Sequence, residues 1–208
     1  PLLSFGDSIK ANQLFPVQGA GELQVLAETY NRVFTENEAT HMVVKHQAEH
    51  DPLTDLLNRG SFDKALKFHD DGKHDFALIL ADVDQFKSVN DTFGHAEGDR
   101  ILKRFASVLR RQTRGSDILV RLGGDEFVVV MKQMPSPETT LKKGCSICRA
   151  FRQEEGCGPF PASCSAGAVI CTRAETLTAE TLAYADEALY RAKSNQKGGC
   201  CLWTGTHA

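Results

Sequence analysis

Acidic residues fall at two places where the sequence predicts a strand to end or to turn. Asp82 directly follows the apolar run 76–81, and Asp125 and Glu126 follow the glycine pair 123–124 between two β-rich runs. If the strand and this hairpin are neighbours in one sheet, Asp82 and Asp125 meet at one edge. Close carboxylates repel, so a hard divalent cation such as Mg²⁺ is their usual partner, and it keeps positions open for substrate phosphates. The acids indicate metal-dependent phosphoryl chemistry, although the same tetrapeptide also makes an ordinary hairpin turn.

Groups that could bind a purine nucleotide lie in the turn after Asp82 and in the last predicted helix. Free backbone N–H groups at such a turn can cradle phosphate oxygens. Asn90 could hydrogen-bond the O6/N7 edge of guanine, and Asp99 could accept from its N1–H and 2-amino groups or instead cap a helix. Lys193 and Lys197, four residues apart on the last predicted helix, could face one triphosphate or could be solvated charges.

A mixed α/β (α+β) domain after Pro52 must position these residues. We expect helices at residues 59–69, 98–113, 137–154 and 179–194, and strands at 76–81, 118–122, 127–131 and 163–171. The second and third strands form a hairpin across the glycine pair. Strands joined by a hairpin and by helical crossovers imply a sheet with helices on its faces.

A different pattern occupies the N-terminal region. Residues 23–47 contain no proline or glycine, and a heptad seam runs along them that becomes polar at Asn37 and Thr40. The stripe is too narrow for a helix that docks on a globular core, so we interpret it as a parallel two-helix stalk. The proline at position 52 ends this helix, because the residue before proline is disfavoured in the helical conformation.

Composition excludes several classes of protein. The 208 residues carry 24 Lys and Arg against 27 Asp and Glu, and a net charge of −3 argues against a nucleic-acid coat. The longest apolar run, 76–81, is far shorter than a membrane span, and no signal peptide is recognisable. Seven cysteines, an odd number, favour reduced thiols in a cytoplasmic protein. We interpret the CxxC at 145–148 as ordinary helix residues and Cys200 and Cys201 as part of the tail.

Five blocks of sequence, in order over residues 50–203, resemble the GGDEF family of diguanylate cyclases. They are DPLTDLLNR (51–59), DVDQFKSVND (82–91), GHAEGD (94–99), RLGGDEF (121–127) and ADEALYRAK (185–193). The resemblance implies a sheet like those of nucleotidyl cyclases and polymerase palms, with the hairpin at the active site. It also implies condensation of two GTP into cyclic di-GMP with release of two pyrophosphates, in a homodimer that holds one GTP per subunit.

The resemblance assigns roles to individual residues. Mg²⁺, with Mn²⁺ as the alternative, would be held by Asp82, the carbonyl of Val83, Asp125 and Glu126. Catalysis would rest on Glu126, Asp125 and Lys87, with Glu126 nearest the attacking 3′-hydroxyl. GTP would be bound by Phe86, Lys87, Asn90, Asp99, Gly123, Gly124, Lys193 and Lys197. The family usually has arginine where Lys197 stands, and lysine loses the bidentate fork to phosphate.

Regulation and context can also be inferred by resemblance. Arg114 and Asp117 match the family's RxxD inhibitory site for cyclic di-GMP, which Arg149 could support. Residues 1–34 partly resemble the end of a HAMP signalling module. We therefore expect a HAMP-like segment with a coiled-coil helix at residues 1–50 and the GGDEF domain at 51–208. The chain would be the cytoplasmic part of an inner-membrane sensor, dimerising through its helix and reaching the membrane only through an upstream region.

Two other functions are open. The first is a catalytically inactive receptor for cyclic di-GMP or GTP, and the second is a dimerising signalling scaffold. Degenerate receptors usually lose an acid from the hairpin, whereas Asp82, Asp125 and Glu126 are all present here. A scaffold would have no use for intact guanine and phosphate positions, so the sequence favours the active enzyme.

Overall fold

The computed structural model describes residues 14, 21–68, 75–132, 136–154, 162–171, 179–195 and 197–205. The chain divides into two units that meet between residues 48 and 49, and each is described by itself. Within the described part of the chain, no helix has the length and apolar character needed to cross a membrane.

The first unit is described mainly as one long helix, α2 (Gly21–Glu49), which confirms the helix predicted at 23–47. Its apolar side chains are largely uncovered: Val25, Leu26 and Val33 are 64%, 45% and 54% exposed. The Thr40 hydroxyl donates to the carbonyl of Glu36 within the helix. Of the HAMP-like residues that precede α2, only Leu14 is among the described residues.

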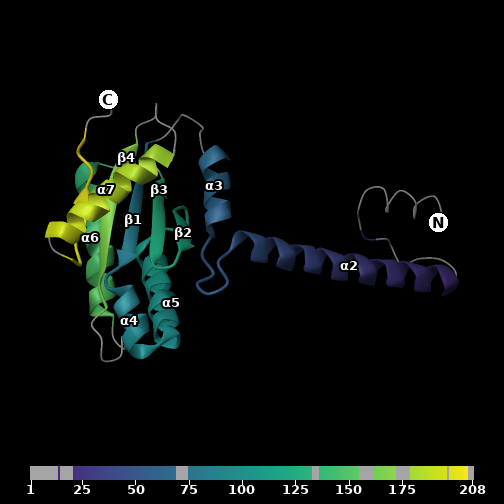
Figure 1. Ribbon diagram of the computed structural model, residues 1–208. Coiled ribbons are helices and arrows are strands. Elements are labelled where there is room, and N and C mark those ends of the chain that lie inside the picture. Colours follow the sequence, from purple (N-terminus) through teal and green to yellow (C-terminus); the bar gives the residue numbers. More distant parts are fainter. Residues whose placement is uncertain are drawn as a thin grey trace. The chain divides into compact units, whose positions relative to one another are not determined.

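The second unit is built on a five-stranded sheet in the order β2-β3-β1-β4-β5 (Figure 1). The strands are β1 (Phe76–Val83), β2 (Ile118–Gly123), β3 (Glu126–Lys132), β4 (Cys164–Cys171) and β5 (Cys200–Leu202). All neighbours are antiparallel except β4 and β5, which are parallel. The central strand β1 is buried on both faces, as its continuous apolar sequence predicts.

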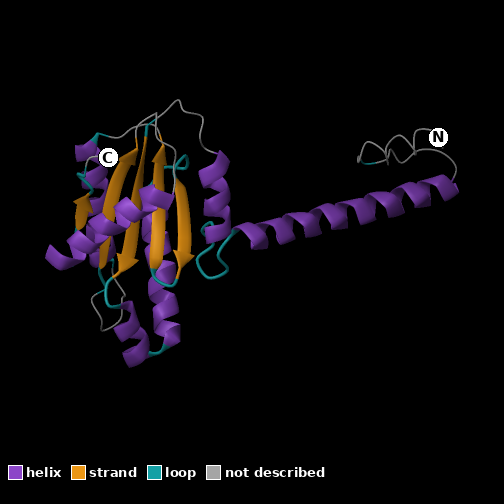
Figure 2. Ribbon diagram, turned by 45° about the horizontal axis from the view of Figure 1, so that its top comes forward, coloured by secondary structure: helices purple, strands orange, loops and turns teal. Residues whose placement is uncertain are grey.

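Helices cover both faces of the sheet (Figure 2). They are α3 (Arg59–Phe68), α4 (Phe86–Phe93), α5 (His95–Gln112), α6 (Pro137–Gln153) and α7 (Ala179–Asn195). Successive side chains of β1 point to opposite faces, so Ile79 joins the core under α4, α5 and α6, whereas Leu78 joins the core under α3 and α7. The mixed α/β sheet with flanking helices that the sequence predicts is confirmed.

Three details differ from the prediction. Residues 86–93, for which no helix is predicted, form helix α4, which is set off by Gln85 and Gly94 with φ values of 59° and 84°. Helix α5 begins at His95 rather than at residue 98, so Asp99 lies inside the helix and does not cap it. The interpretation of Cys200 and Cys201 as tail residues is wrong, because both belong to the edge strand β5.

Candidate active site

The acidic hairpin lies beside the end of β1, as the sequence analysis requires. Strands β1 and β3 are antiparallel with Asp82 opposite Glu126, and the Val83 N–H donates to the Asp125 carbonyl at 3.3 Å. Gly123 and Gly124 turn the chain with φ values of 148° and 53°, a region that side chains other than glycine rarely enter. Backbone pairing therefore holds the acids of the two segments together at one edge of the sheet.

A buried aromatic contact fixes the strand that follows the acidic turn. Phe127 follows Glu126 directly, and its ring is fully buried edge-on against the ring of Phe105 from α5, at 4.9 Å between centroids. Phe105 in turn contacts Phe151 of α6. The acidic turn is thus the exposed end of a strand whose next side chain is fixed in the core.

The carboxylates form an electrostatic site that favours a cation. Burial raises the pKa of Asp82, and the nearby charges of Asp125 and Glu126 raise it further, while Lys193 opposes them. The Lys193 Nζ lies 2.7 Å from Asp82 Oδ1 and supplies the positive charge in this structure. Among the described residues, no three His, Cys, Asp or Glu side chains already stand in a metal-binding arrangement. Carboxylate and carbonyl oxygens with a shared need for positive charge nevertheless fit a hard divalent cation.

Close packing of α7 on β4 brings Lys193 to this edge. A Cβ at Gly167 of β4 would lie 2.1 Å from the carbonyl oxygen of Ala185 in α7, so only glycine lets the helix approach this far. Ala188 and Ala192, also on the buried side of α7, keep the same close spacing. Small residues at the contact therefore set the position of the lysine beside Asp82.

The two predicted guanine-reading residues come from neighbouring helices, Asn90 from α4 and Asp99 from α5. The amide oxygen of Asn90 is buried and has no hydrogen-bond partner among the described residues. It sits directly over Gly98, where a Cβ would lie only 2.0 Å away. Gly98 thus provides the room that the Asn90 amide occupies.

The predicted phosphate-binding residues Phe86, Lys87, Lys193 and Lys197 lie in two helices and one turn. Phe86 and Lys87 begin α4, whose first N–H groups receive no side-chain cap from Gln85. Lys197 is not on the same helix as Lys193, which corrects the prediction of a pair one helical turn apart. Helix α7 ends at Asn195, and Lys197 is an exposed residue of the turn before β5.

A contact that the sequence analysis missed ties the start of the domain to the hairpin. The guanidinium of Arg121 donates to both Asp51 oxygens at 2.9 and 3.1 Å and to the Gly124 carbonyl at 2.8 Å. Asp51 also accepts from the N–H and hydroxyl of Thr54 at 2.8 and 2.7 Å. Asp51, near the start of the second unit, therefore shares one arginine with the acidic turn.

We expect Asp51→Asn to lower the free energy of unfolding by about 1–2 kcal/mol at pH 7. Burial alone would raise the pKa of Asp51, but the hydrogen bonds from Thr54 and Arg121 outweigh it and hold the pKa below its usual 3.8. The ionised carboxylate thus adds stability above pH 3.8, and this stability is lost as the pH falls through the lowered pKa. Urea unfolding of wild type and variant between pH 7 and pH 3 should show the difference shrinking.

The matched control for this variant is Asp55→Asn in the same loop. Asp55 is exposed and reaches Arg110 only at 3.5 Å, so its replacement should change the unfolding free energy by less than about 0.5 kcal/mol. A loss at Asp51 that equals the control, or that stays constant with pH, would contradict the account.

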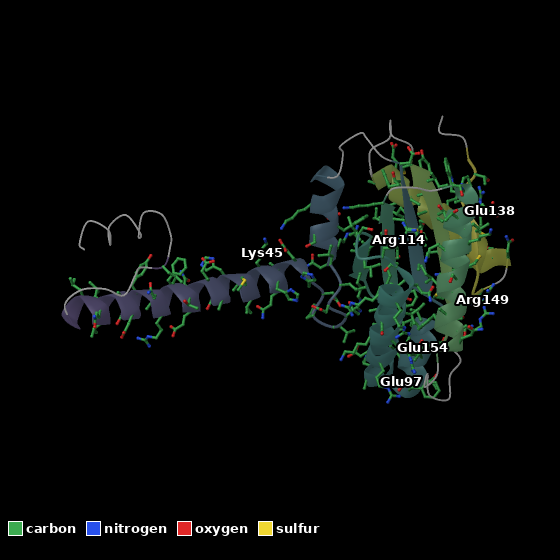
Figure 3. The ribbon with its side chains drawn as sticks, turned by 180° about the vertical axis from the view of Figure 1, so that it is seen from behind. Lys45, Glu97, Arg114, Glu138, Arg149 and Glu154 are labelled. Carbon is green, nitrogen blue, oxygen red and sulfur yellow. The ribbon has the colours of Figure 1, made fainter. Side chains whose placement is uncertain are left out.

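The predicted product site is a turn beside a separate hollow. The Arg114 N–H donates to Asp117 Oδ2 at 2.9 Å, and the Asp117 N–H donates back to the Arg114 carbonyl at 3.0 Å. Both residues line a hollow of about 360 Å³, together with Arg110. Arg149 projects from α6 (Figure 3) and is among the residues that line another hollow. The structure thus brings Arg114 and Asp117 together but does not bring Arg149 to them.

Residues 48–199 match the family described as "Diguanylate cyclase, GGDEF domain". Diguanylate cyclase DgcP of Pseudomonas aeruginosa is 37% identical over 84% of this chain, and diguanylate cyclase TpbB of the same organism is 33% identical over 88%. The chain spans only 27% and 45% of the length of these two relatives.

Solved structures show the same fold. The coiled coil and GGDEF domain of DgcB from Caulobacter crescentus, solved in complex with c-di-GMP, superimposes with a TM-score of 0.73 at 25% identity, over 85% of this chain and 96% of that one. The GGDEF domain of TpbB from Pseudomonas aeruginosa superimposes with a TM-score of 0.63 at 33% identity, over 74% of this chain and 94% of that one.

Proposed function

Because the chain belongs to the GGDEF family of diguanylate cyclases, we propose that it condenses two GTP molecules into cyclic di-GMP and releases two pyrophosphates. One observation carries the proposal: Asp82 lies directly opposite the acidic hairpin, with Lys193 bonded to it. All three acids of the site are present, which an inactive receptor would not need.

The three acids and Lys193 have different roles in the proposed reaction. Asp82, Asp125 and the carbonyl of Val83 would hold Mg²⁺ or Mn²⁺, and such an ion would supply positive charge at the α-phosphate and at the attacking 3′-oxygen. Glu126 stands next to the attacking 3′-hydroxyl, either accepting its proton or adding a ligand. Lys193, which pairs with Asp82 in this structure, would contact the phosphates of bound GTP. The protein otherwise acts by positioning, as is usual for phosphoryl transfer.

GTP is held at its two ends. Asn90 and Asp99 hydrogen-bond the guanine: the NH2 group of Asn90 donates to the O6/N7 edge, and Asp99 accepts from N1–H and the 2-amino group. The buried amide oxygen of Asn90 lies against Gly98, which leaves the NH2 group to contact the base. The triphosphate is bound by the start of α4 at Phe86 and Lys87, together with Lys193 and Lys197. The glycine pair at 123–124 leaves open space beside the acids, since a Cβ at either position would meet nothing within 4 Å.

Catalysis requires a homodimer. Each domain presents one acidic hairpin and one guanine site, so two GTP molecules must face each other, with each 3′-hydroxyl aimed at the other's α-phosphate. Helix α2 supports this arrangement, because Leu26, Val33 and Val44 of the heptad seam are exposed, as in a helix that pairs in a coiled coil. The likeness to a structure that contains a coiled coil and a GGDEF domain supports the same reading.

We expect Gly98→Ala to raise the KM for GTP about tenfold while leaving the fold intact. A Cβ at this position would displace the Asn90 amide, which it would approach to 2.0 Å, and so disturb guanine binding. The matched control is Gly60→Ala in α3, where the nearest atom to a new Cβ is 3.5 Å away and only helix propensity changes. An unchanged KM in Gly98→Ala would exclude Asn90 from GTP binding.

Product inhibition should act through Arg114 and Asp117. We expect Arg114→Ala to raise the cyclic di-GMP concentration that halves activity by about tenfold or more, because a bidentate contact to phosphate is lost. Arg111→Ala is the control: Arg111 pairs with Glu154 at 2.5 Å and does not line the hollow. Initial rates at increasing cyclic di-GMP concentration test this prediction. Equal inhibition of wild type, Arg114→Ala and Arg111→Ala would show that cyclic di-GMP does not inhibit through Arg114. Arg149 lines a different hollow and is not part of this site.

The experiment that tests the function is incubation of the purified chain with GTP and Mg²⁺, followed by separation of the nucleotides. The proposal predicts cyclic di-GMP with two pyrophosphates per product, and no such product from ATP. Binding of cyclic di-GMP without any turnover, at protein concentrations high enough to form dimers, would instead favour the receptor function.

A further inference from the structure

Asp84 is a buried carboxylate that the proposed mechanism does not use. It is only 5% exposed, although it lies two residues after Asp82. The Ser163 hydroxyl donates to its Oδ2 at 2.6 Å, and the Ser165 hydroxyl donates to its Oδ1 at 2.7 Å. Its backbone N–H donates to the Ser163 carbonyl at 2.9 Å. Both oxygens are therefore engaged inside the protein, and Asp84 acts on the site through its neighbours.

The Ser165 hydroxyl has a second partner in a distant segment. The Gly198 N–H donates to it at 3.1 Å, so the hydroxyl must send its own proton to Asp84. Gly198 has a φ of 82° and directly follows Lys197. Its carbonyl accepts from Arg152 at 3.0 Å, and a Cβ there would lie 1.8 Å from the same guanidinium. Hydrogen bonds on both of its peptide groups thus hold the turn that presents Lys197.

We propose that Asp84 and Ser165 are positioning residues for GTP, because they join the turn that begins α4 to the turn that carries Lys197. The inference rests on the proposed function, in which Phe86, Lys87 and Lys197 bind the triphosphate. Phe86 and Lys87 follow β1 in the chain, and Lys197 precedes β5. Strand β4, which bears Ser165, lies between β1 and β5 in the sheet (Figure 1). Phosphate binding across two turns needs a fixed separation, which the buried network supplies.

The test compares two serine variants. Ser165→Ala breaks the link to Gly198, whereas Ser163→Ala removes a hydrogen bond to the same carboxylate and leaves that link in place. The ligands are 3′-deoxy-GTP, which cannot condense because it lacks the attacking hydroxyl, and 3′-deoxy-GMP, which lacks the β- and γ-phosphates. Ser165→Ala should weaken 3′-deoxy-GTP about five- to tenfold and 3′-deoxy-GMP less than about twofold, and Ser163→Ala should change both less than about twofold.

The outcomes separate this inference from the proposed function. Equal weakening of both ligands by Ser165→Ala, no weakening, or the same loss in Ser163→Ala would overturn the positioning role. If the wild-type protein does not bind 3′-deoxy-GTP more tightly than 3′-deoxy-GMP, the proposed binding of the triphosphate by Phe86, Lys87, Lys193 and Lys197 is itself wrong. If Ser165→Ala does not fold, the isosteric Asp84→Asn takes its place, with the same selective loss for the triphosphate expected and an unselective effect contradicting the inference.

Discussion

Replacement of Glu126 by glutamine should lower kcat for cyclic di-GMP formation by about a thousandfold and leave the protein at least as stable as the wild type. Glu126 stands opposite Asp82, and its charge helps to raise the pKa of that buried carboxyl. The substitution removes one of three mutually repelling charges and so lowers the electrostatic repulsion in the folded state. It also removes the group that accepts the proton of the 3′-hydroxyl. Steady-state kinetics and thermal unfolding of the same preparation measure both effects.

The control for this variant is Glu138→Gln on α6, where the carboxylate is exposed and pairs with the exposed Lys142. It should retain wild-type activity and lose less than about 0.5 kcal/mol of stability. The assignment of Glu126 fails if its glutamine variant keeps more than about a tenth of the wild-type kcat. A large loss of stability would show that Glu126 supports the fold rather than the reaction.

Lys193→Met should lower kcat/KM about a hundredfold and move the acidic limb of its pH profile to higher pH. The lysine lies 2.7 Å from Asp82 and opposes the burial that raises the pKa of this carboxyl. Methionine keeps the apolar stem but removes the charge, so the pKa of Asp82 rises further. Because cation binding needs ionised Asp82, activity at subsaturating Mg²⁺ is lost at a higher pH as the solution is acidified.

Lys197→Met provides the comparison. Lys197 lies beyond the end of α7, and it is absent from the charges that act on Asp82. We expect a smaller loss of kcat/KM and no movement of the acidic limb. Equal displacement of the limb in both variants, or none in Lys193→Met, would mean that the ion pair does not control the protonation of Asp82.

Local patterns explain why much of the fold and of the acidic site could be predicted. An apolar run that ends in Asp82 and a glycine turn that precedes Asp125 each specify a strand end within a few residues. Once both segments are placed in one sheet, their acids meet without further information. The heptad seam is also a local signal, and the helix that it predicts at 23–47 is present as α2.

The rest depended on long-range contacts or weak local signals. Helix α4 has eight residues, so its apolar stripe of Phe86, Val89 and Phe93 is too short to distinguish a helix from a turn. Strand β5 has three residues and exists because it pairs with β4. Arg121 and Asp51 are 70 residues apart, and their ion pair appears only when β2 and the turn at the start of the domain are folded together. The position of Lys197 was misjudged because the chain turns at Gly198 in a conformation that a helical pattern does not reveal.

The central claim is that two acidic sites, each with its own GTP, must face each other in a dimer. The most direct test mixes wild type with Glu126→Gln at constant total protein, allows subunits to exchange, and follows the initial rate of cyclic di-GMP formation. The account predicts a rate that falls with the square of the wild-type fraction, to about one quarter when half of the subunits are wild type, because only dimers with two intact sites close the ring. A rate that falls in proportion to the wild-type fraction would show that one site suffices, and would contradict the account.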